Sequence, residues 1–246
     1  MSTISATVRR VASDVNTLHS EYLDDDGLAE AFRRFLDWQS QYLLAQHAEF
    51  AERAEYRDAT AFVVNDLTGY EVNKRDHDLA RIIPLMSRVL PDSVLATLAS
   101  ALELNANALK INLTICRYLV ASGEIDALTE RNYAAAVRAV TDRDSALTMV
   151  LAIKDLGLEL DRIVHTPMIG STLASMALPA RLMGFRALHH FLAEGYRVFR
   201  ALPDTQGFLD ELEAQMLIVY ARLYDSPLES LDTAGTSAST TSLDGS

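Results

Sequence analysis

The chain has 246 residues, of which 49% are hydrophobic and 23% charged, and these ordinary globular values exclude wholesale disorder and a fibrous repeat. Its formal charge of −12 argues against broad binding to nucleic acid or anionic membranes, since phosphate neutralisation needs clustered Lys and Arg. The single cysteine, Cys116, excludes an intrachain disulfide and any metal site built on several cysteines.

Apolar residues that recur at steps of three and four predict helices along most of the chain. The first carries an apolar stripe from Ile4 to Tyr22, and an acidic segment separates it from the second. In chain order, the expected helices cover residues 4–22, 28–53, 58–67, 76–90, 92–122, 128–141, 144–164, 168–178, 182–202 and 205–224.

Capping and helix-breaking residues set the expected boundaries. Asp26 is expected to cap the second helix, because a carboxylate there accepts hydrogen bonds from first-turn amides. Gly69 and Gly123 are expected to end the third and fifth helices. Pro179 and Gly184 are expected to divide the two helices that follow residue 167, since proline removes a backbone donor.

Alternating β-branched runs are absent, so the sequence predicts an all-α fold without a sheet. We expect a single multi-helix bundle of about nine or ten helices over residues 1–225. A domain boundary near residues 123–126 is the alternative. Residues 226–246 are mostly Ser, Thr, Gly, Ala and Asp, and we expect this tail to be disordered because it has little to bury.

The longest stretch free of charged side chains, residues 163–180, contains Pro, Gly, His and several hydroxyl residues. A bilayer span requires about 20 mainly apolar residues. We therefore expect no stable membrane insertion. The start of the chain has no apolar run of signal-peptide length, and we expect a cytoplasmic protein with Cys116 reduced.

Sequence motifs for common chemistries are missing. The chain has no dinucleotide fingerprint, phosphate-binding loop or nucleophile elbow, and no Glu-x-x-His of the carboxylate-bridged di-iron sites. We therefore expect no cofactor and assign no catalytic residue, and we leave open whether the protein is an enzyme.

One pair of residues has the spacing of a metal or general-base site. Asp161 and His165 lie four residues apart on one helical face. They are the candidate metal ligands if a metal is bound, but a local hydrogen bond near the helix end is the favoured interpretation.

Polar residues inside apolar helix patterns are the candidate ligand-binding residues. Glu103 and Asn107 share one face of the fifth helix with Lys110, while Asn105 and Asn112 share another. Asn is unfavourable inside a helix, so these residues indicate either a buried polar network or lined cavity, or simply an outer face.

An acidic cluster is the second part of the candidate site. Asp66, Asp76 and Asp78, with Arg81, either face an internal site together with Glu103 or act structurally. In the structural alternative Asp76 caps the fourth helix and Asp78 pairs with Arg81.

These segments resemble a family of bacterial proteins known by its FFLEELY motif. The motif segment is Phe62-Val63-Val64-Asn65-Asp66-Leu67-Thr68-Gly69, and the downstream matches are Arg75-Asp76-His77-Asp78-Leu79-Ala80-Arg81-Ile82-Ile83-Pro84, Leu90-Pro91, Ala101-Leu102-Glu103-Leu104, Asn132-Tyr133, Leu160-Asp161, Pro179-Ala180 and Phe191-Leu192-Ala193-Glu194-Gly195-Tyr196.

The resemblance covers about Trp38 to Glu213, and it implies a helical fold but no catalytic residues. The motif is degenerate here, since Asn65 and Asp66 replace its two Glu residues and Thr68 its Tyr. A carboxylate expected further along appears as Asn112. Any metal site of the family is therefore expected to be weakened in this chain.

The leading hypothesis is a non-enzymatic helical binding or interaction protein, whose ligand is a hydrophobic small molecule or a partner helix. Methionine is frequent on adaptable binding surfaces, and five lie in the second half of the chain: Met149, Met168, Met176, Met183 and Met216. A homodimer is left open.

The alternative is a helical metalloenzyme of oxidase or oxygenase type with a heme-oxygenase-like bundle. It rests on carboxylates and histidines at helical spacing, namely Asp66, Asp76, Asp78, Glu103, Asp161 and His165. Peripheral membrane attachment through the first helix is a third, weaker hypothesis, because the chain is acidic overall.

Overall fold

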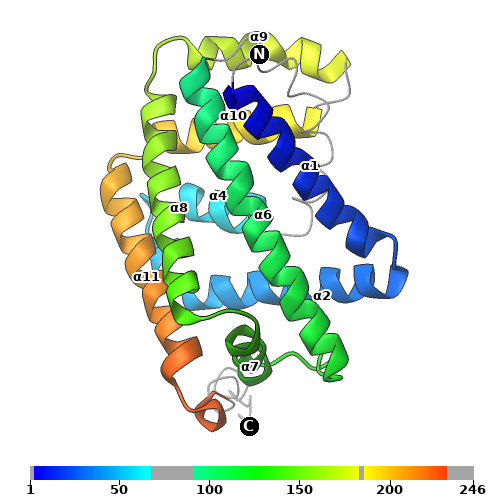
Figure 1. Ribbon diagram of the computed structural model, residues 1–246. Helices are drawn as coiled ribbons and strands as arrows, with labels where there is room; N and C mark the ends of the chain where they lie inside the picture. The colour runs from blue at the N-terminus through cyan, green and yellow to red at the C-terminus, as the bar shows by residue number, and fades with distance from the viewer. Residues whose placement is uncertain (1–2, 68–90, 183–185, 232–246) are drawn as a thin grey trace, which may run out of the picture.

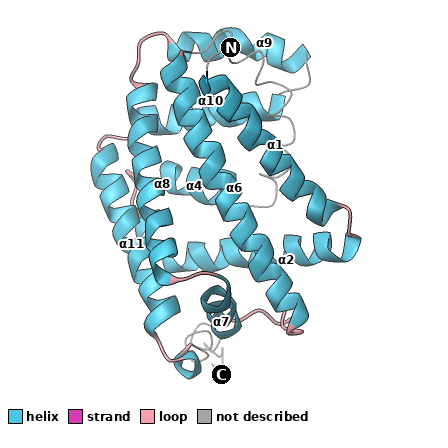
Figure 2. Ribbon diagram, in the orientation of Figure 1, coloured by secondary structure: helices cyan, strands magenta, loops and turns pink. Residues whose placement is uncertain are grey.

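The computed structural model describes residues 3–67, 91–182 and 186–231. Within these ranges it contains ten α-helices, one 3-10 turn and no strand (Figure 2). The prediction of an all-α fold is therefore confirmed. The helices are α1 (Thr3–Leu23), α2 (Asp26–Gln46), α3 (Ala48–Glu52), α4 (Arg57–Leu67), α6 (Asp92–Ala121), α7 (Glu130–Val140), α8 (Arg143–Val164), α9 (Ile169–Leu182), α10 (Arg186–Ala201) and α11 (Thr205–Asp225).

The longest helix, α6, runs through the middle of the bundle (Figure 1). Helix α1 packs along one side of it, and the antiparallel pair α8 and α11 lies on the other. Helix α2 crosses behind α6, α7 lies at the lower end of the view, and α9 and α10 cross the upper end. Gly157 of α8 allows the close approach to α11, because an added Cβ there would lie 2.5 Å from a Leu209 methyl carbon.

Helix starts follow local capping rules, with one correction. Asp25, and not Asp26, caps α2, because its carboxylate accepts a hydrogen bond from the Leu28 amide at 3.1 Å. Thr129 caps α7 in a capping box with Asn132, whose side chain accepts in return from the Thr129 amide. These short-range bonds satisfy amides that have no partner inside the helix.

Helix ends depend on the local backbone in the same way. Gly123 has a φ of 72° and closes α6, and its amide and that of Glu124 donate to Val120 and Leu119 carbonyls. The predicted stop at Gly123 is thus confirmed. The predicted single helix over 28–53 is interrupted at one point, because the chain turns at His47 and resumes as the short α3.

Pro179 does not divide two helices, which corrects the prediction. Helix α9 continues through Pro179 to Leu182, close to its C-terminal end. Proline there removes only the hydrogen bond to the carbonyl of Ser175. Both residues are exposed, so water can satisfy that carbonyl. Gly184, the other predicted divider, and Gly69 lie outside the described residues, as does the predicted helix 76–90.

One continuous core joins the two halves of the chain. Its buried side chains come from α1, α2, α6, α7 and α11, and the largest are Tyr22, Phe32, Phe35, Leu113 and Leu119. Residues before and after 123–126 therefore pack into the same cluster, and the alternative domain boundary is not observed there.

The domain extends beyond residue 225, which corrects the predicted limit. Residues Leu228–Ser230 form a 3-10 turn, and Leu231 is buried at 3% exposure in the main core. The Arg138 guanidinium donates to the Leu223 and Ser226 carbonyls, both at 2.6 Å, and so fixes the chain as it leaves α11. Residues 232–246 of the predicted tail lie outside the described residues.

None of the described helices combines the length with the apolar character that a bilayer span requires.

Candidate ligand-binding cavity

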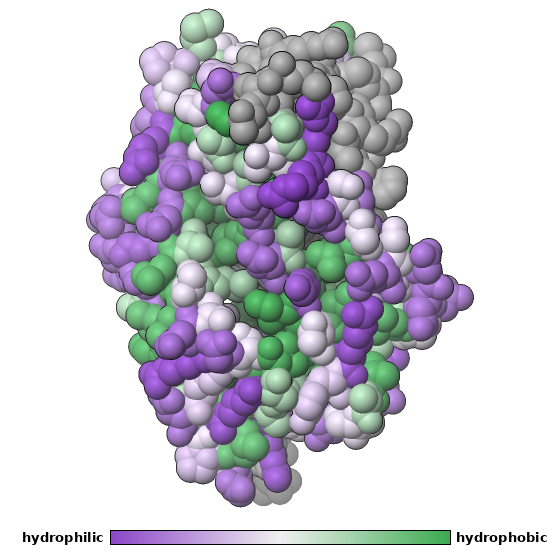
Figure 3. All heavy atoms as spheres, in the orientation of Figure 1, coloured by the Kyte–Doolittle hydropathy of each residue, from purple (hydrophilic) through white to green (hydrophobic). Residues whose placement is uncertain are grey.

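A cavity of about 200 Å³ lies among α2, α6, α7, α8 and α11. Figure 3 shows hydrophobic surface around a hollow on the face where α6 and α8 run side by side. An engineered cavity of about 150 Å³ accepts benzene, so this volume suits a molecule of somewhat larger size. The cavity therefore has room for a small molecule.

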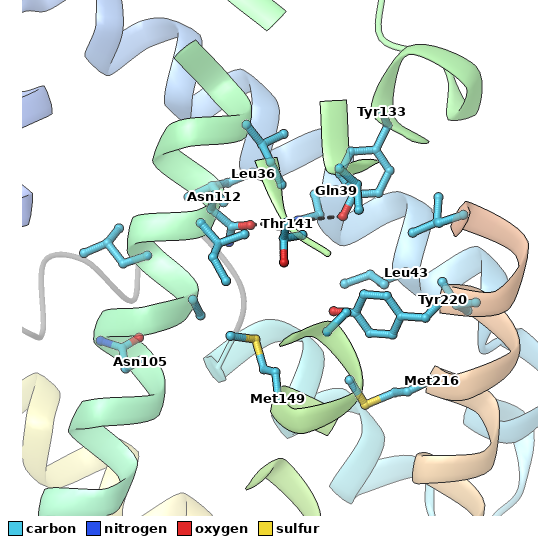
Figure 4. Close-up of a pocket in the computed structure, with 18 of the residues that line it drawn as sticks. Leu36, Gln39, Leu43, Asn105, Asn112, Tyr133, Thr141, Met149, Met216 and Tyr220 are labelled. Atoms are coloured by element: carbon cyan, nitrogen blue, oxygen red, sulfur yellow. Dashed lines mark hydrogen bonds between the residues drawn. The ribbon is translucent and has the colours of Figure 1, made fainter. Parts of the chain in front are cut away.

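The walls of the cavity are mostly aliphatic and aromatic. Each of the five helices contributes at least one apolar side chain, among them Leu36, Leu43, Ile115, Val137 and Val219. Two flexible side chains, Met149 of α8 and Met216 of α11, lie close together on one side of it (Figure 4). Thioether side chains adapt to irregular ligand shapes, so these walls can accommodate apolar groups.

A polar network lies at the other side of the cavity (Figure 4). Gln39 Nε2 donates to Asn112 Oδ1 at 3.1 Å and to the Tyr133 hydroxyl at 3.0 Å. Gln39 is only 8% exposed, although it lies on the apolar face of α2. The two bonds offset the cost of burying its amide and link α2 to α6 and α7.

Four further polar side chains line the cavity, namely His47, Asn105, Thr141 and Tyr220. The Tyr220 ring of α11 points its hydroxyl toward the centre of the cavity (Figure 4). His47 is 7% exposed, and its Nδ1 donates to the Leu43 carbonyl at 2.7 Å. Its Nε2 is buried without a hydrogen-bond partner among the described residues.

An aromatic cluster lies behind the polar network. Trp38 stacks on Tyr42, with ring centroids 5.3 Å apart, and meets Tyr133 edge-on at the same centroid distance. Burial raises the pKa of the Tyr133 hydroxyl well above its usual range. Tyr133 therefore stays protonated at ordinary pH and acts as a hydrogen-bonding group, not as a base.

A partly buried ion pair closes the outer side of this cluster. Glu130 accepts two hydrogen bonds from the Arg222 guanidinium and one from the Tyr42 hydroxyl at 3.1 Å. Burial, together with the Glu130 charge, raises the pKa of Tyr42. Neither charged residue lines the cavity.

The predicted polar positions of α6 divide between the cavity and the solvent. Asn105 and Asn112 line the cavity. Of the two alternatives predicted for their face, this is the lined cavity and not the outer face. Glu103 and Asn107 are exposed on the other face, and Glu103 forms an ion pair with Arg10 at 3.2 Å. Glu103 and Asn107 therefore do not line this cavity, and their role in ligand binding stays a prediction.

The rest of the predicted acidic cluster is not placed. Asp76, Asp78 and Arg81 lie outside the described residues. Asp66 lies in α4, but its side chain is also outside them. Their predicted grouping with Glu103 therefore stays a prediction.

Asp161 and His165 lie at the C-terminal end of α8. His165 Nδ1 donates to the Asp161 carbonyl oxygen at 2.8 Å, and Thr205 donates to the Asp161 carboxylate at 2.7 Å. These bonds close α8 and tie it to the start of α11, which matches the favoured structural interpretation. Within the described ranges, no three His, Cys, Asp or Glu side chains are grouped as metal ligands.

Sequence reasoning missed most of the cavity's polar groups. Gln39 was visible as a polar residue within the apolar stripe of the second helix, and this was the available signal. Tyr133, Tyr220 and His47 carried no distinguishing pattern, because tyrosine and histidine occur both in cores and at surfaces.

The fold and the cavity define an all-helical protein with a small, mainly apolar internal site. The chain belongs to a family described as Domain of unknown function (DUF8198), whose model matches residues 18–228. No curated protein and no solved structure matches the chain. The family description specifies no activity, and the resemblance to the FFLEELY-motif family stays a prediction.

Proposed function

We propose that the protein binds a small, mostly apolar molecule in the cavity among α2, α6, α7, α8 and α11. The observation that carries the proposal is a cavity of about 200 Å³ lined by side chains of five helices, with the network of Gln39, Asn112 and Tyr133 on one side. Ligand sites in proteins are typically concave and apolar with a few placed polar groups. The cavity has this composition, although it is smaller than most.

The size of the cavity favours a small molecule over the alternative of a partner helix. An α-helix with its side chains is about 10 Å across. A segment of that width does not fit into about 200 Å³. A hydrophobic small molecule, or the end of one, is the ligand that the space supports.

The side chains around the cavity favour binding over catalysis. Apart from the His47 imidazole, the described lining includes no carboxylate, amine or thiol, and the buried Tyr133 is held protonated. His47 has no carboxylate or nucleophile hydrogen-bonded to its ring among the described residues, so the paired groups of an acid–base or nucleophilic site are not seen there. Amide and phenol groups instead orient a ligand by hydrogen bonds.

Methyl-labelled methionine provides the test, because Met149 and Met216 line the cavity whereas Met168 is 78% exposed. Para-xylene is the probe, added to protein that carries ¹³C-methyl methionine. We expect saturable shifts of the Met149 and Met216 methyl resonances and no shift for Met168. Shifts of Met168 alone, or of none of the three, would contradict the proposal.

A cavity-filling variant provides the matched control. Ala108 lines the cavity on α6, so Ala108→Phe places an aromatic ring inside it. Ala139 is exposed on α7, and Ala139→Phe adds the same ring in solvent. We expect Ala108→Phe to abolish the saturable shifts and Ala139→Phe to leave them unchanged.

A further inference from the structure

The chemistry of the lining specifies the ligand more closely, and this inference rests on the proposed function. None of the described side chains around the cavity is Asp, Glu, Lys or Arg. An ionised group that enters such a site loses its hydration without gaining a counter-charge, which is strongly unfavourable. A carboxylate, phosphate or ammonium group inside the cavity is therefore disfavoured.

The polar network leaves particular atoms available to a ligand. Gln39 Nε2 uses its two hydrogens on Asn112 Oδ1 and the Tyr133 hydroxyl. Gln39 Oε1 and Asn112 Nδ2 then have no hydrogen-bond partner among the described residues. The pair consequently keeps one acceptor oxygen and one donor nitrogen for a ligand.

Buried histidine adds a second, independent observation. Because a carbonyl only accepts, Nδ1 of His47 carries the hydrogen that it donates to Leu43, and in the neutral ring Nε2 is an acceptor. His47 is 93% buried, lines the cavity and has this lone pair unpartnered in the described part of the chain. A buried acceptor without a donor is unfavourable, and a ligand hydroxyl is one group that satisfies it.

We propose that the ligand is a small neutral alcohol or phenol. Its hydroxyl accepts from Asn112 Nδ2 and donates its one hydrogen to Gln39 Oε1 or to His47 Nε2. Its apolar body extends toward Met149 and Met216 (Figure 4). A hydroxyl is the smallest neutral group that both donates and accepts, so it matches the mixed pair. A ring with one or two small substituents matches the volume of about 200 Å³.

Three probes of one shape test the proposal at neutral pH. Para-cresol carries a hydroxyl, para-xylene replaces it with a methyl group, and para-toluate carries a charge instead. Affinities are measured by titration of the Met149 and Met216 methyl resonances in the full chain. We expect para-cresol to bind about fivefold more tightly than para-xylene, the gain of one net hydrogen bond. We expect no saturable shift with para-toluate.

Matched variants on α6 locate the hydroxyl. Asn112→Leu removes the donor inside the cavity, and Asn107→Leu makes the same change on the exposed face. The preference for para-cresol is expected to disappear in Asn112→Leu and to persist in Asn107→Leu. The comparison of the three probes on the parent chain stands on its own if Asn112→Leu fails to fold.

The outcomes separate the two proposals. If para-xylene binds as tightly as para-cresol, the alcohol or phenol assignment is wrong while the cavity remains a ligand site. Preferential binding of para-toluate also overturns the assignment, since it shows that a charge is accepted. If no probe gives saturable shifts, the proposed function itself is wrong.

Discussion

Replacement of Leu231 by Ala tests whether the segment after α11 belongs to the folded domain. Leu231 is 3% exposed and lies in the main core. Truncation of a buried Leu to Ala costs about 2–5 kcal/mol. The lower end of this range applies, because the residues after α11 can detach locally while the rest of the domain stays folded. The loss of stability then cannot exceed the free energy by which these residues dock on the core. We expect the free energy of unfolding to fall by about 2 kcal/mol.

Urea unfolding followed by circular dichroism measures this loss. We expect a lower midpoint with an unchanged slope, and a melting temperature lower by about 4–8 °C for a chain of this size. Glu229→Ala is the control, because Glu229 is exposed in the same 3-10 turn. If Leu231→Ala unfolds at the same urea concentration as Glu229→Ala, Leu231 is not a core residue and the domain ends at α11.

Three further predictions follow from the ion pair, one helix cap and the cysteine. Glu130→Ala is expected to cost about 2 kcal/mol in thermal melts, because Arg222 then loses its bidentate partner; an unchanged melt would contradict this. Hydrogen bonds from Ser145 lower the pKa of the Asp142 carboxyl below its ordinary value of 3.8, so the Asp142 cap of α8 stabilises the fold fully above pH 3.8 and less as the pH falls below it. The difference in unfolding free energy between the parent and Asp142→Ala should therefore shrink when denaturation is measured below pH 3.8. A difference that stays constant with pH would refute the assignment. Burial raises the pKa of Cys116 to about 11, so mass spectrometry should detect no alkylation by iodoacetamide at mildly alkaline pH until urea unfolds the chain.

The sequence predicted the helices well where local signals are strong. Helices α6, α8 and α11 begin and end within a few residues of the predicted limits, because capping Asp residues and Gly123 act over three or four residues. Pro179 and His47 show the opposite. A helix can continue through proline near its end, and the turn at His47 involves no glycine or proline.

The cavity could be predicted only in part. The spacing of Asn105 and Asn112 indicated a shared face, and that face lines the cavity. Glu103 and Asn107 share a face too, but the packing of α1 along α6 leaves it in solvent, where Glu103 meets Arg10. Which polar face turns inward depends on the other helices, and a single helix pattern does not contain that information.

Trp38 is the only tryptophan of the chain, and its position gives the protein an intrinsic optical reporter. Its indole lies flat against Tyr42 and edge-on to Tyr133, and Tyr133 in turn forms part of the cavity wall. A ligand that changes the hydroxyl orientation of Tyr133 changes the local electric field at the indole. Emission from this one fluorophore can therefore follow cavity occupancy in the unmodified protein, without a label or a competing dye.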